Sequence, residues 1–375
     1  MKKILVLTDD LPWGHRSIAR AICGYLKKKE EKEGWQVFYE EVKMGEAWIA
    51  DLYTGMSRLF PKINRLPYKA LSLKSIRKLS LAIVGHGDLE LKELVRKSKP
   101  DVIISSYFIH SHVLVSLRKK FGFDFKLWTV VADPWTINPI SFVPDADLHL
   151  VYDEVGVTDG LKHGIKRDKI LKTGWWTRPE MFEKFDRLKS RKKLGFRDDR
   201  PVIFVGGGSL GTTAIMKFLP ILFLLKKPIG VVFNSGTDKM VFKIVERYKK
   251  IFDKFFKRKS FIQIKNLGWI DNMAEVLSAC DMVFGKAGPN FLFDVVASGK
   301  PLVAITHIGG QEDGNIDLIR KKKLGWVKEK TTELAKFLKN YSENPDKYNK
   351  KFRKSVVEER EKNKQSLGKI NTYLR

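Results

Sequence analysis

Cysteine is scarce in this chain of 375 residues, and long hydrophobic runs are missing. Cys23 and Cys280 lie far apart and outside any C-x-x-C pair, so neither a disulfide framework nor a thiolate zinc site is indicated. The most apolar stretch, residues 218–225, is far shorter than the roughly 20 residues of a membrane-spanning helix. The apolar run that follows Met1 is too short for a secretory signal. These absences favour a cytoplasmic protein without a transmembrane helix.

Acidic residues are also in short supply. Asp and Glu number 43 against 71 Lys and Arg, which gives a formal net charge of +28. Such a charge favours an anionic partner, but composition leaves nucleic acid, anionic lipid and phosphorylated small molecules open. Because 43% of the residues are hydrophobic and 30% are charged, the chain is typical of a globular protein, and its length fits two domains.

Acids are wholly absent between Leu52 and Gly87. We call residues 52–87 the basic segment, since Arg and Lys are spread there among aliphatic and aromatic side chains. Its second half predicts an amphipathic helix with two lysines opposite one apolar face: Lys74 and Lys78 against Leu73, Ile76, Leu79 and Ile83. Such an element can rest on an anionic bilayer, although packing the apolar stripe into the domain is an equally good interpretation. No nucleic-acid partner is expected, because no recognition motif accompanies the segment.

Short aliphatic runs bounded by turn signals recur along the chain, with helical stretches between them. One series extends from residues 4–7 to residues 170–172, and a second from residues 202–205 to residues 301–305. Strands that are apolar throughout are buried on both faces. The fold class is therefore predicted to be α/β, with two doubly wound, Rossmann-like domains. We place the boundary near Pro179, which gives domains 1–178 and 179–375.

Four loops of the second series follow predicted strands, where open α/β sheets collect ligand-binding groups. Residues 206–211 are glycine-rich and precede a helical stretch, an arrangement that can hold a phosphate, although a tight turn without a ligand is the alternative. The others are residues 268–275, 285–290 and 309–315. Asp294, early in the helix after the third loop, can accept two hydrogen bonds from a ribose diol or simply pair with a lysine.

These motifs resemble the nucleotide-sugar domain of glycosyltransferase family 28, which includes monogalactosyldiacylglycerol synthases and processive diacylglycerol glucosyltransferases. The similarity lies in residues 268–281, in Lys286-Ala287-Gly288 and in residues 310–315. It implies a GT-B fold, in which two Rossmann-like domains face a cleft, and a UDP-sugar donor. It further implies donor-binding residues: Ile270 for uracil, Asp294 for ribose, Gln311 and Asn315 for the sugar, with Glu312 and Gly288 in the same motifs, and Gly207, Gly208, Ser209 and Gly211 for the diphosphate.

The first half is similar to the diacylglycerol-sugar branch of the family. Residues 14–17 resemble the end of its glycine-rich loop after the first strand, residues 129–133 its T-D motif, and residues 173–178 a segment whose arginine, here Arg178, reaches donor phosphates. The resemblance implies a lipid acceptor, diacylglycerol or a glycolipid, and an enzyme peripheral on the inner face of the membrane. The adjacent Trp175 and Trp176 are expected to pack in the core rather than line the cleft.

Sugar transfer requires a base for the acceptor hydroxyl and positive charge or N–H dipoles for the departing diphosphate. His15 and Asp133 are the two candidate bases, and Arg178 can supply positive charge. No D-x-D clamp is found in a matching context, so neither a metal nor another cofactor is expected. Two alternatives remain: a non-hydrolysing UDP-sugar epimerase, and an inactive nucleotide-sugar-binding homologue, because Trp13, Asn138 and Phe291 depart from the family pattern.

Overall fold

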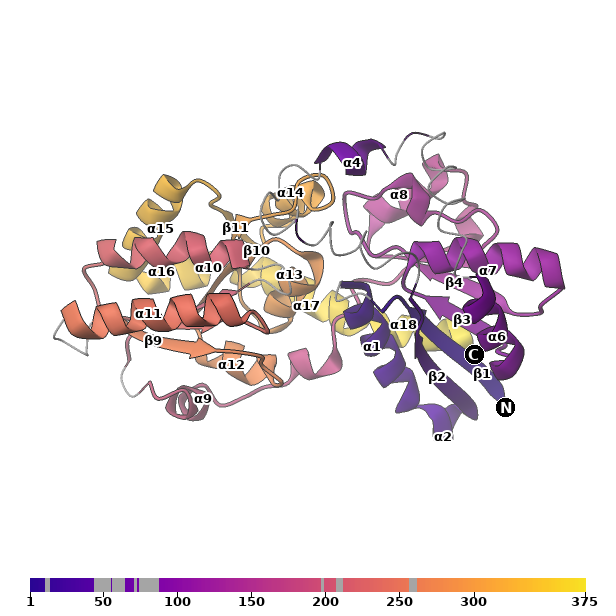
Figure 1. Cartoon of the computed structure of the whole chain (residues 1–375), viewed down its shortest axis with the longest axis horizontal. Helices are drawn as coiled ribbons and strands as arrows, with labels where there is room; N and C mark the ends of the chain where they lie inside the picture. Colours follow the sequence, from indigo (N-terminus) through magenta and orange to yellow (C-terminus); the bar gives the residue numbers. More distant parts are fainter. Residues whose placement is uncertain are drawn as a thin grey trace.

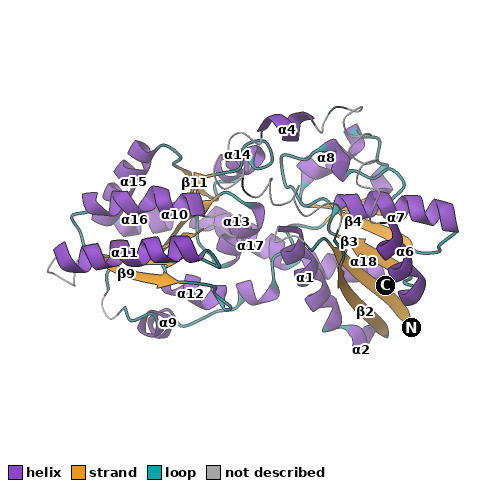
Figure 2. Ribbon diagram, viewed as in Figure 1, coloured by secondary structure: helices purple, strands orange, loops and turns teal. Residues whose placement is uncertain are grey.

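The computed structural model describes residues 1–10, 14–43, 55, 65–70, 73, 88–196, 199–206, 212–255 and 262–375. These residues form two six-stranded sheets, in which all paired strands are parallel. The sheets lie in two lobes side by side (Figure 1), and helices flank them in each lobe (Figure 2). The predicted α/β class with two doubly wound units is confirmed.

The first sheet has the order β2-β1-β3-β4-β5-β6. Its strands are β1 (Lys2–Thr8), β2 (Trp35–Glu41), β3 (Val102–Ser105), β4 (Lys126–Val130), β5 (Leu148–Val151) and β6 (Ile170–Lys172). The described helices of this lobe are α1 (Gly14–Lys27), α2 (Glu30–Glu33), α4 (Arg65–Ala70), α6 (Asp88–Ser98), α7 (Phe108–Phe121) and α8 (Glu154–Lys162). Residues 4–7 of β1 are fully buried, as expected for a central strand covered on both faces.

The second sheet has the order β12-β11-β10-β7-β8-β9. Its strands are β7 (Val202–Gly206), β8 (Ile229–Asn234), β9 (Ile262–Leu267), β10 (Met282–Lys286), β11 (Leu302–Thr306) and β12 (Gly325–Val327). Its helices are α9 (Arg187–Lys193), α10 (Thr212–Phe218), α11 (Lys239–Phe255), α12 (Met273–Ala279), α13 (Pro289–Ala297), α14 (Asp313–Lys321), α15 (Thr331–Glu343) and α16 (Pro345–Lys351).

Each sheet reverses its winding direction once, between β1 and β3 in the first and between β7 and β10 in the second. The loops that leave two such strands diverge, so a crevice opens at the carboxyl end of the sheet. The backbones approach closely at the second reversal, because a Cβ on Gly285 would lie 2.2 Å from the carbonyl oxygen of Gly206. Glycine is therefore required in β10 beside the crevice.

Of the last two helices, α17 (Arg353–Lys364) packs against α13 of the second lobe, and α18 (Ser366–Leu374) packs against α1 of the first. The ring of Tyr373 lies 6.0 Å from that of Trp128, and the Arg375 Nε donates to Glu33 at 2.9 Å. In Figure 1 these yellow helices extend from the second lobe to the first, where both chain ends lie. The boundary near Pro179 stays a prediction. The chain end nevertheless packs on the lobe formed by β1–β6, although we had grouped it with residues 179–375.

No helix among the described residues is long and apolar enough to cross a lipid bilayer.

Candidate functional site

The carboxyl ends of the two sheets face each other, and loops from both lobes touch there. The Asn290 Nδ2 of the second lobe donates to the carbonyl oxygen of Gly14 in the first at 2.8 Å. The backbone N–H of Gly314 donates to the Thr136 hydroxyl. Since the predicted ligand loops follow these strands, the contacts bring the candidate groups of the two lobes together.

The loops after β10 and β11 are tied to each other by buried polar groups. The Lys286 ammonium pairs with Glu312, and both residues are buried. The second oxygen of Glu312 accepts from the backbone N–H of Ile308 at 2.7 Å. Asn315 Nδ2 donates to the Ala287 carbonyl at 2.8 Å, while its Oδ1 is buried and has no hydrogen-bond partner among the described residues. A Cβ on Gly288 would lie 2.8 Å from the Lys286 ammonium and 3.2 Å from Glu312, so the predicted Gly288, Glu312 and Asn315 belong to one cluster.

Arg178 and Asp294 are neighbours, although the resemblance implies that Arg178 binds the donor phosphates and Asp294 the ribose. An Arg178 guanidinium nitrogen lies 3.5 Å from a carboxylate oxygen of Asp294. Burial raises the pKa of Asp294 to about 6, and the positive charge of Arg178 opposes this shift. The pair lies where the segment after β6 meets α13.

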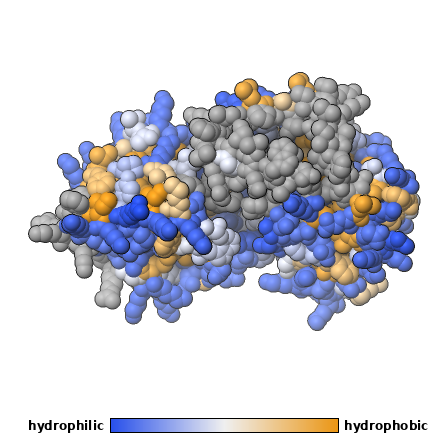
Figure 3. Space-filling view, viewed as in Figure 1, coloured by the Kyte–Doolittle hydropathy of each residue, from blue (hydrophilic) through white to orange (hydrophobic). Residues whose placement is uncertain are grey.

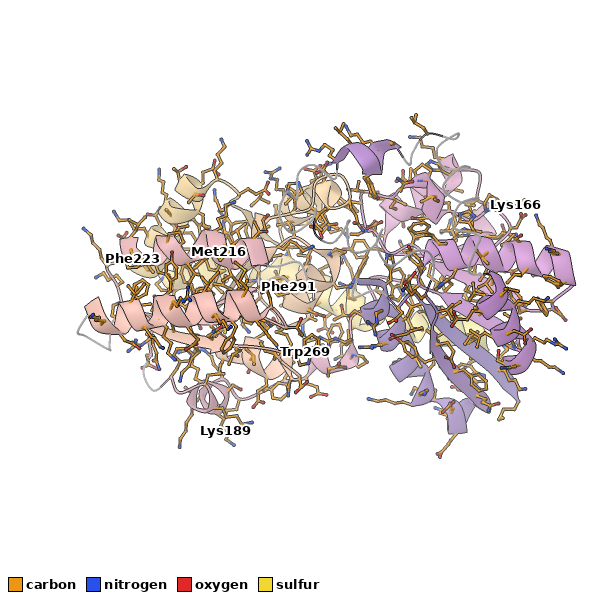
Figure 4. All side chains as sticks on the ribbon, viewed as in Figure 1. Lys166, Lys189, Met216, Phe223, Trp269 and Phe291 are labelled. Carbon is orange, nitrogen blue, oxygen red and sulfur yellow. The ribbon has the colours of Figure 1, made fainter. Side chains whose placement is uncertain are left out.

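Ile270 lies in the turn before α12 and packs, partly buried, against the apolar cluster that includes Ala287 and Phe291. It follows β9, which is separated from β10 by β8 and β7. Three strand spacings of about 4.8 Å amount to roughly 14 Å. Trp269 beside it is 72% exposed, whereas Phe291 is buried; both lie at the end of the second lobe nearest the first (Figure 4). The strand ends that carry the candidate residues are thus spread along one edge of the second sheet.

Several predicted features lie outside the described residues. These are the loop of Gly207, Gly208, Ser209 and Gly211, the departure at Trp13, and all of the basic segment except Gly55, residues 65–70 and Leu73. Asn138 and Phe291, the other departures, are both buried. Trp175 and Trp176 are also buried, and the ring of Trp175 stacks on Phe293 at 4.9 Å. Their predicted core packing is confirmed.

His15 lies at the first turn of α1, beside the crevice of the first sheet. Its Nδ1 is 2.8 Å from the carbonyl oxygen of Ser106. A carbonyl only accepts hydrogen bonds, so the Nδ1 carries the proton and the Nε2 keeps a lone pair. Part of the residue stays exposed, but desolvation lowers its pKa to about 4, outweighing the bond to Ser106. The imidazole is therefore neutral at pH 7.

Asp133 follows β4 and lies at the junction of the two lobes. The Nε2 of Gln311 approaches its Oδ1 at 3.4 Å from the second lobe. Burial raises the pKa of Asp133 to about 7; hydrogen bonds from Gln311 and Tyr68 oppose the shift, and the charge of Glu312 adds to it. Asp133 therefore titrates near neutrality, whereas His15 does not.

Sequence comparisons place both halves of the chain in one group of proteins. The family described as Monogalactosyldiacylglycerol (MGDG) synthase matches residues 15–175, and the Glycosyltransferase family 28 C-terminal domain matches residues 202–367. Residues 202–367 thus carry the C-terminal domain of glycosyltransferase family 28.

The individual relatives are distant in sequence. It is 25% identical over 363 residues to a probable monogalactosyldiacylglycerol synthase of Nicotiana tabacum, with 89% of this chain and 63% of the relative covered. A processive diacylglycerol beta-glucosyltransferase of Bacillus licheniformis is 22% identical, with 84% and 80% covered. The chain thus spans about 63% of the length of the first of these curated relatives. Anabaena HepE in complex with UDP shares the fold, with a TM-score of 0.59, 14% identity, and 100% and 98% of the two chains covered.

One group of side chains at the lobe junction was not predicted from the sequence. Arg65 of α4 donates two hydrogen bonds of 3.0 Å to Asp313 of α14. The Nε2 of His307 lies 3.0 Å from Asp313, and its Nδ1 lies 2.6 Å from Glu329. Burial lowers the pKa of His307, but the two carboxylates outweigh it and the net shift is upward. His307 directly follows β11, and its position at a strand end was the only signal in the sequence that could have pointed to this group.

No described group of three His, Cys, Asp or Glu side chains is arranged to hold a metal ion.

Replacing Gly314 by Ala should force the two lobes apart. A Cβ there would lie 2.5 Å from the Thr136 hydroxyl oxygen and 2.6 Å from the Trp135 carbonyl carbon. Backbone cannot move aside locally, so we expect a larger radius of gyration in small-angle X-ray scattering. The free energy of unfolding should also fall, because the hydrogen bonds between the lobes at Gly314, Asn290 and Gln311 are lost when the lobes part. Gly24→Ala, with nothing within 4 Å of its Cβ, is the control. Superimposable scattering curves for the two variants would show that the lobes are not in contact.

Proposed function

We propose that this protein transfers a sugar from a UDP-sugar to a lipid acceptor, diacylglycerol or a glycolipid, at a membrane surface. The observation that carries the proposal is the junction where Gln311 of the β11 loop meets Asp133 of the first lobe. A group that can take a proton thereby lies beside a loop that carries the family's donor motif. The printed names of the plant and Bacillus relatives support a lipid acceptor, and the UDP complex of HepE supports a UDP donor.

The donor is proposed to lie along the carboxyl edge of the second sheet. The backbone near Ile270 binds uracil at one end, Asp294 holds the ribose, and Gln311, Glu312 and Asn315 bind the sugar at the other. The loop of Gly207, Gly208, Ser209 and Gly211, with Gly288, holds the diphosphate, and Arg178 supplies positive charge to it. The separation of roughly 14 Å between the β9 and β10 ends and the cluster after β10 and β11 support this extended arrangement.

The reaction is proposed as a direct displacement. The base takes the acceptor hydroxyl proton while the acceptor oxygen forms a bond to the anomeric carbon. The bond from that carbon to the diphosphate oxygen breaks, and its electron pair leaves with UDP, where N–H groups and Arg178 stabilise the charge. Contact between the lobes excludes water, which protects the donor from hydrolysis. Inversion at the anomeric carbon is the outcome that the family implies.

Of the two candidate bases, Asp133 is the better matched to neutral pH. A general base works best when its pKa lies near the working pH, and the pKa of Asp133 is raised to about 7 while that of His15 is lowered to about 4. His15 retains a neutral Nε2 that can accept a hydrogen bond from the acceptor. We therefore assign proton removal to Asp133 and orientation of the acceptor to His15.

The membrane contact is proposed to involve the basic segment. Its described helix α4 exposes Leu66 to 76% together with Arg65 and Lys69, and Leu73 is 57% exposed. Apolar side chains beside cations suit the boundary of an anionic bilayer. Hydrophilic residues also cover much of the described part of the visible face of both lobes (Figure 3). This placement corresponds to a cytoplasmic enzyme peripheral on the inner face of the membrane.

A panel of radiolabelled UDP-sugars tests the activity. We expect label to move into the lipid phase when the protein is incubated with vesicles that contain diacylglycerol and an anionic lipid. The yield should not change in excess EDTA, since the proposed charge stabilisation needs no metal. Label that stays in the aqueous phase, or an epimerised donor formed without acceptor, would contradict sugar transfer and support the epimerase. Loss of transfer in EDTA would contradict metal independence alone.

The pH dependence of kcat/KM separates the two bases. Asp133 must be ionised to accept a proton, and burial raises its pKa to about 7, so activity should decline as the pH falls through about 7. With His15 as the base, the decline would come only near pH 4, where its pKa lies. Asp133→Asn should cost roughly 10²–10⁴-fold in rate, whereas His15→Ala should be less active but keep the break near pH 7. A decline in activity only near pH 4, together with a larger loss in His15→Ala than in Asp133→Asn, would instead make His15 the base that removes the acceptor proton.

A further inference from the structure

The second lobe exposes a group of large apolar side chains that the proposed sugar transfer does not use. The α10–α11 patch consists of residues that are 38–72% exposed: Met216 of α10, Phe223 and Leu224 of the 3-10 turn Leu219–Leu224, and Met240 and Ile251 of α11. Figure 3 shows hydrophobic atoms among hydrophilic ones over this part of the lobe, and Figure 4 shows Met216 and Phe223 beside α11 on the same visible face.

Packing between the elements makes the patch continuous. The ring of Phe223 stacks on that of Phe252 of α11, with centroids 4.4 Å apart and planes at 23°. Tyr248, one turn earlier, lies 6.1 Å from Phe223. Helices α10 and α11 also contact each other. The exposed side chains of the three elements therefore belong to one face, where the exposed ring of Phe223 rests on the buried ring of Phe252.

A stripe of cations borders this apolar face. Lys243, Arg247, Lys250 and Lys254 recur every three or four residues and are exposed, so they share one side of α11. Met240, Ile244 and Ile251 fall on the adjacent side by the same spacing, and Val241, Val245 and Phe252 face the core. Glu246 lies beyond the cations and is engaged by Asn266 at 3.0 Å. Around α11, buried apolar side chains on the core side are therefore followed by exposed apolar side chains and then by cationic ones.

This order matches the depth profile of a lipid interface. Apolar side chains enter the boundary between headgroups and acyl chains, while Lys and Arg beside them reach the anionic headgroups. A surface exposed only to water gains nothing from Met240, which is 72% exposed. We propose that the α10–α11 patch is a second membrane-docking surface, specific for anionic bilayers and located on the donor-binding lobe.

Docking through this surface would hold the second lobe at the bilayer, in addition to the contact proposed for the basic segment of the first lobe. The inference shares the membrane location of the proposed function, but it rests on neither the sugar transfer nor the contacts of the basic segment. Its test is therefore a binding measurement without donor or acceptor. A protein that fails to transfer sugar but binds vesicles through α11 would contradict the proposed function and leave this inference standing.

Sedimentation with vesicles of phosphatidylglycerol and phosphatidylcholine tests the surface. The double variant Lys243→Glu and Lys250→Glu should lower the partition coefficient by about tenfold or more, since each cation near an anionic surface contributes about fivefold. The uncharged double variant Leu224→Ser and Met240→Ser should also weaken binding. Both side chains are more than half exposed, so these changes should leave the far-UV circular dichroism and the unfolding midpoint unaltered.

The control is Lys166→Glu with Lys189→Glu, which changes the net charge equally on exposed sites elsewhere (Figure 4). We expect it to bind vesicles much more tightly than the patch variants. Equal binding by patch and control variants would overturn the inference, because bulk charge alone would then explain the attraction. A parent protein that is dimeric in sedimentation velocity, with patch variants that are monomeric yet bind vesicles normally, would overturn it as well, since a second copy would then cover the patch.

Discussion

Contact between the carboxyl ends of two parallel sheets is the constraint on which the rest of the structure depends. Parallel strands place every following loop at one edge, and here the two edges meet at Gly314 against Thr136 and at Asn290 against Gly14. Side chains that are far apart in the sequence, such as Asp133 and Gln311, touch only because of this meeting.

Desolvation at this junction sets the protonation of the candidate groups. Asp133 and Asp294 have raised pKa values of about 7 and about 6, mainly through burial, while the same effect keeps His15 neutral. Neighbours then decide how far each shift goes: Arg178 stabilises the charged form of Asp294, and Glu312 disfavours that of Asp133. In a chain of formal charge +28, Asp133 and Asp294 are thus two acids that respond near neutral pH.

Local patterns in the sequence predicted the sheets and the loops but not the contacts between lobes. Fully apolar runs such as residues 202–205 indicated central parallel strands, and glycines and polar residues after them indicated the ligand loops. The pairing of Arg65 with Asp313, and of Arg178 with Asp294, depends on how the lobes pack, and no periodicity encodes that. The return of α18 to the first lobe was missed for the same reason. The pKa values of His15 and Asp133 depend on burial, which residue type alone does not reveal.

Hydrogen–deuterium exchange with and without UDP tests most directly whether the junction side of the second sheet holds the nucleotide. Bound UDP should slow exchange of backbone amides in the turn at residues 268–271 and in the loops at residues 285–290 and 309–315, because these amides and the helices that follow them face the proposed donor. Unchanged exchange in all three segments at saturating UDP, or protection confined to the opposite edge of either sheet, would contradict the account.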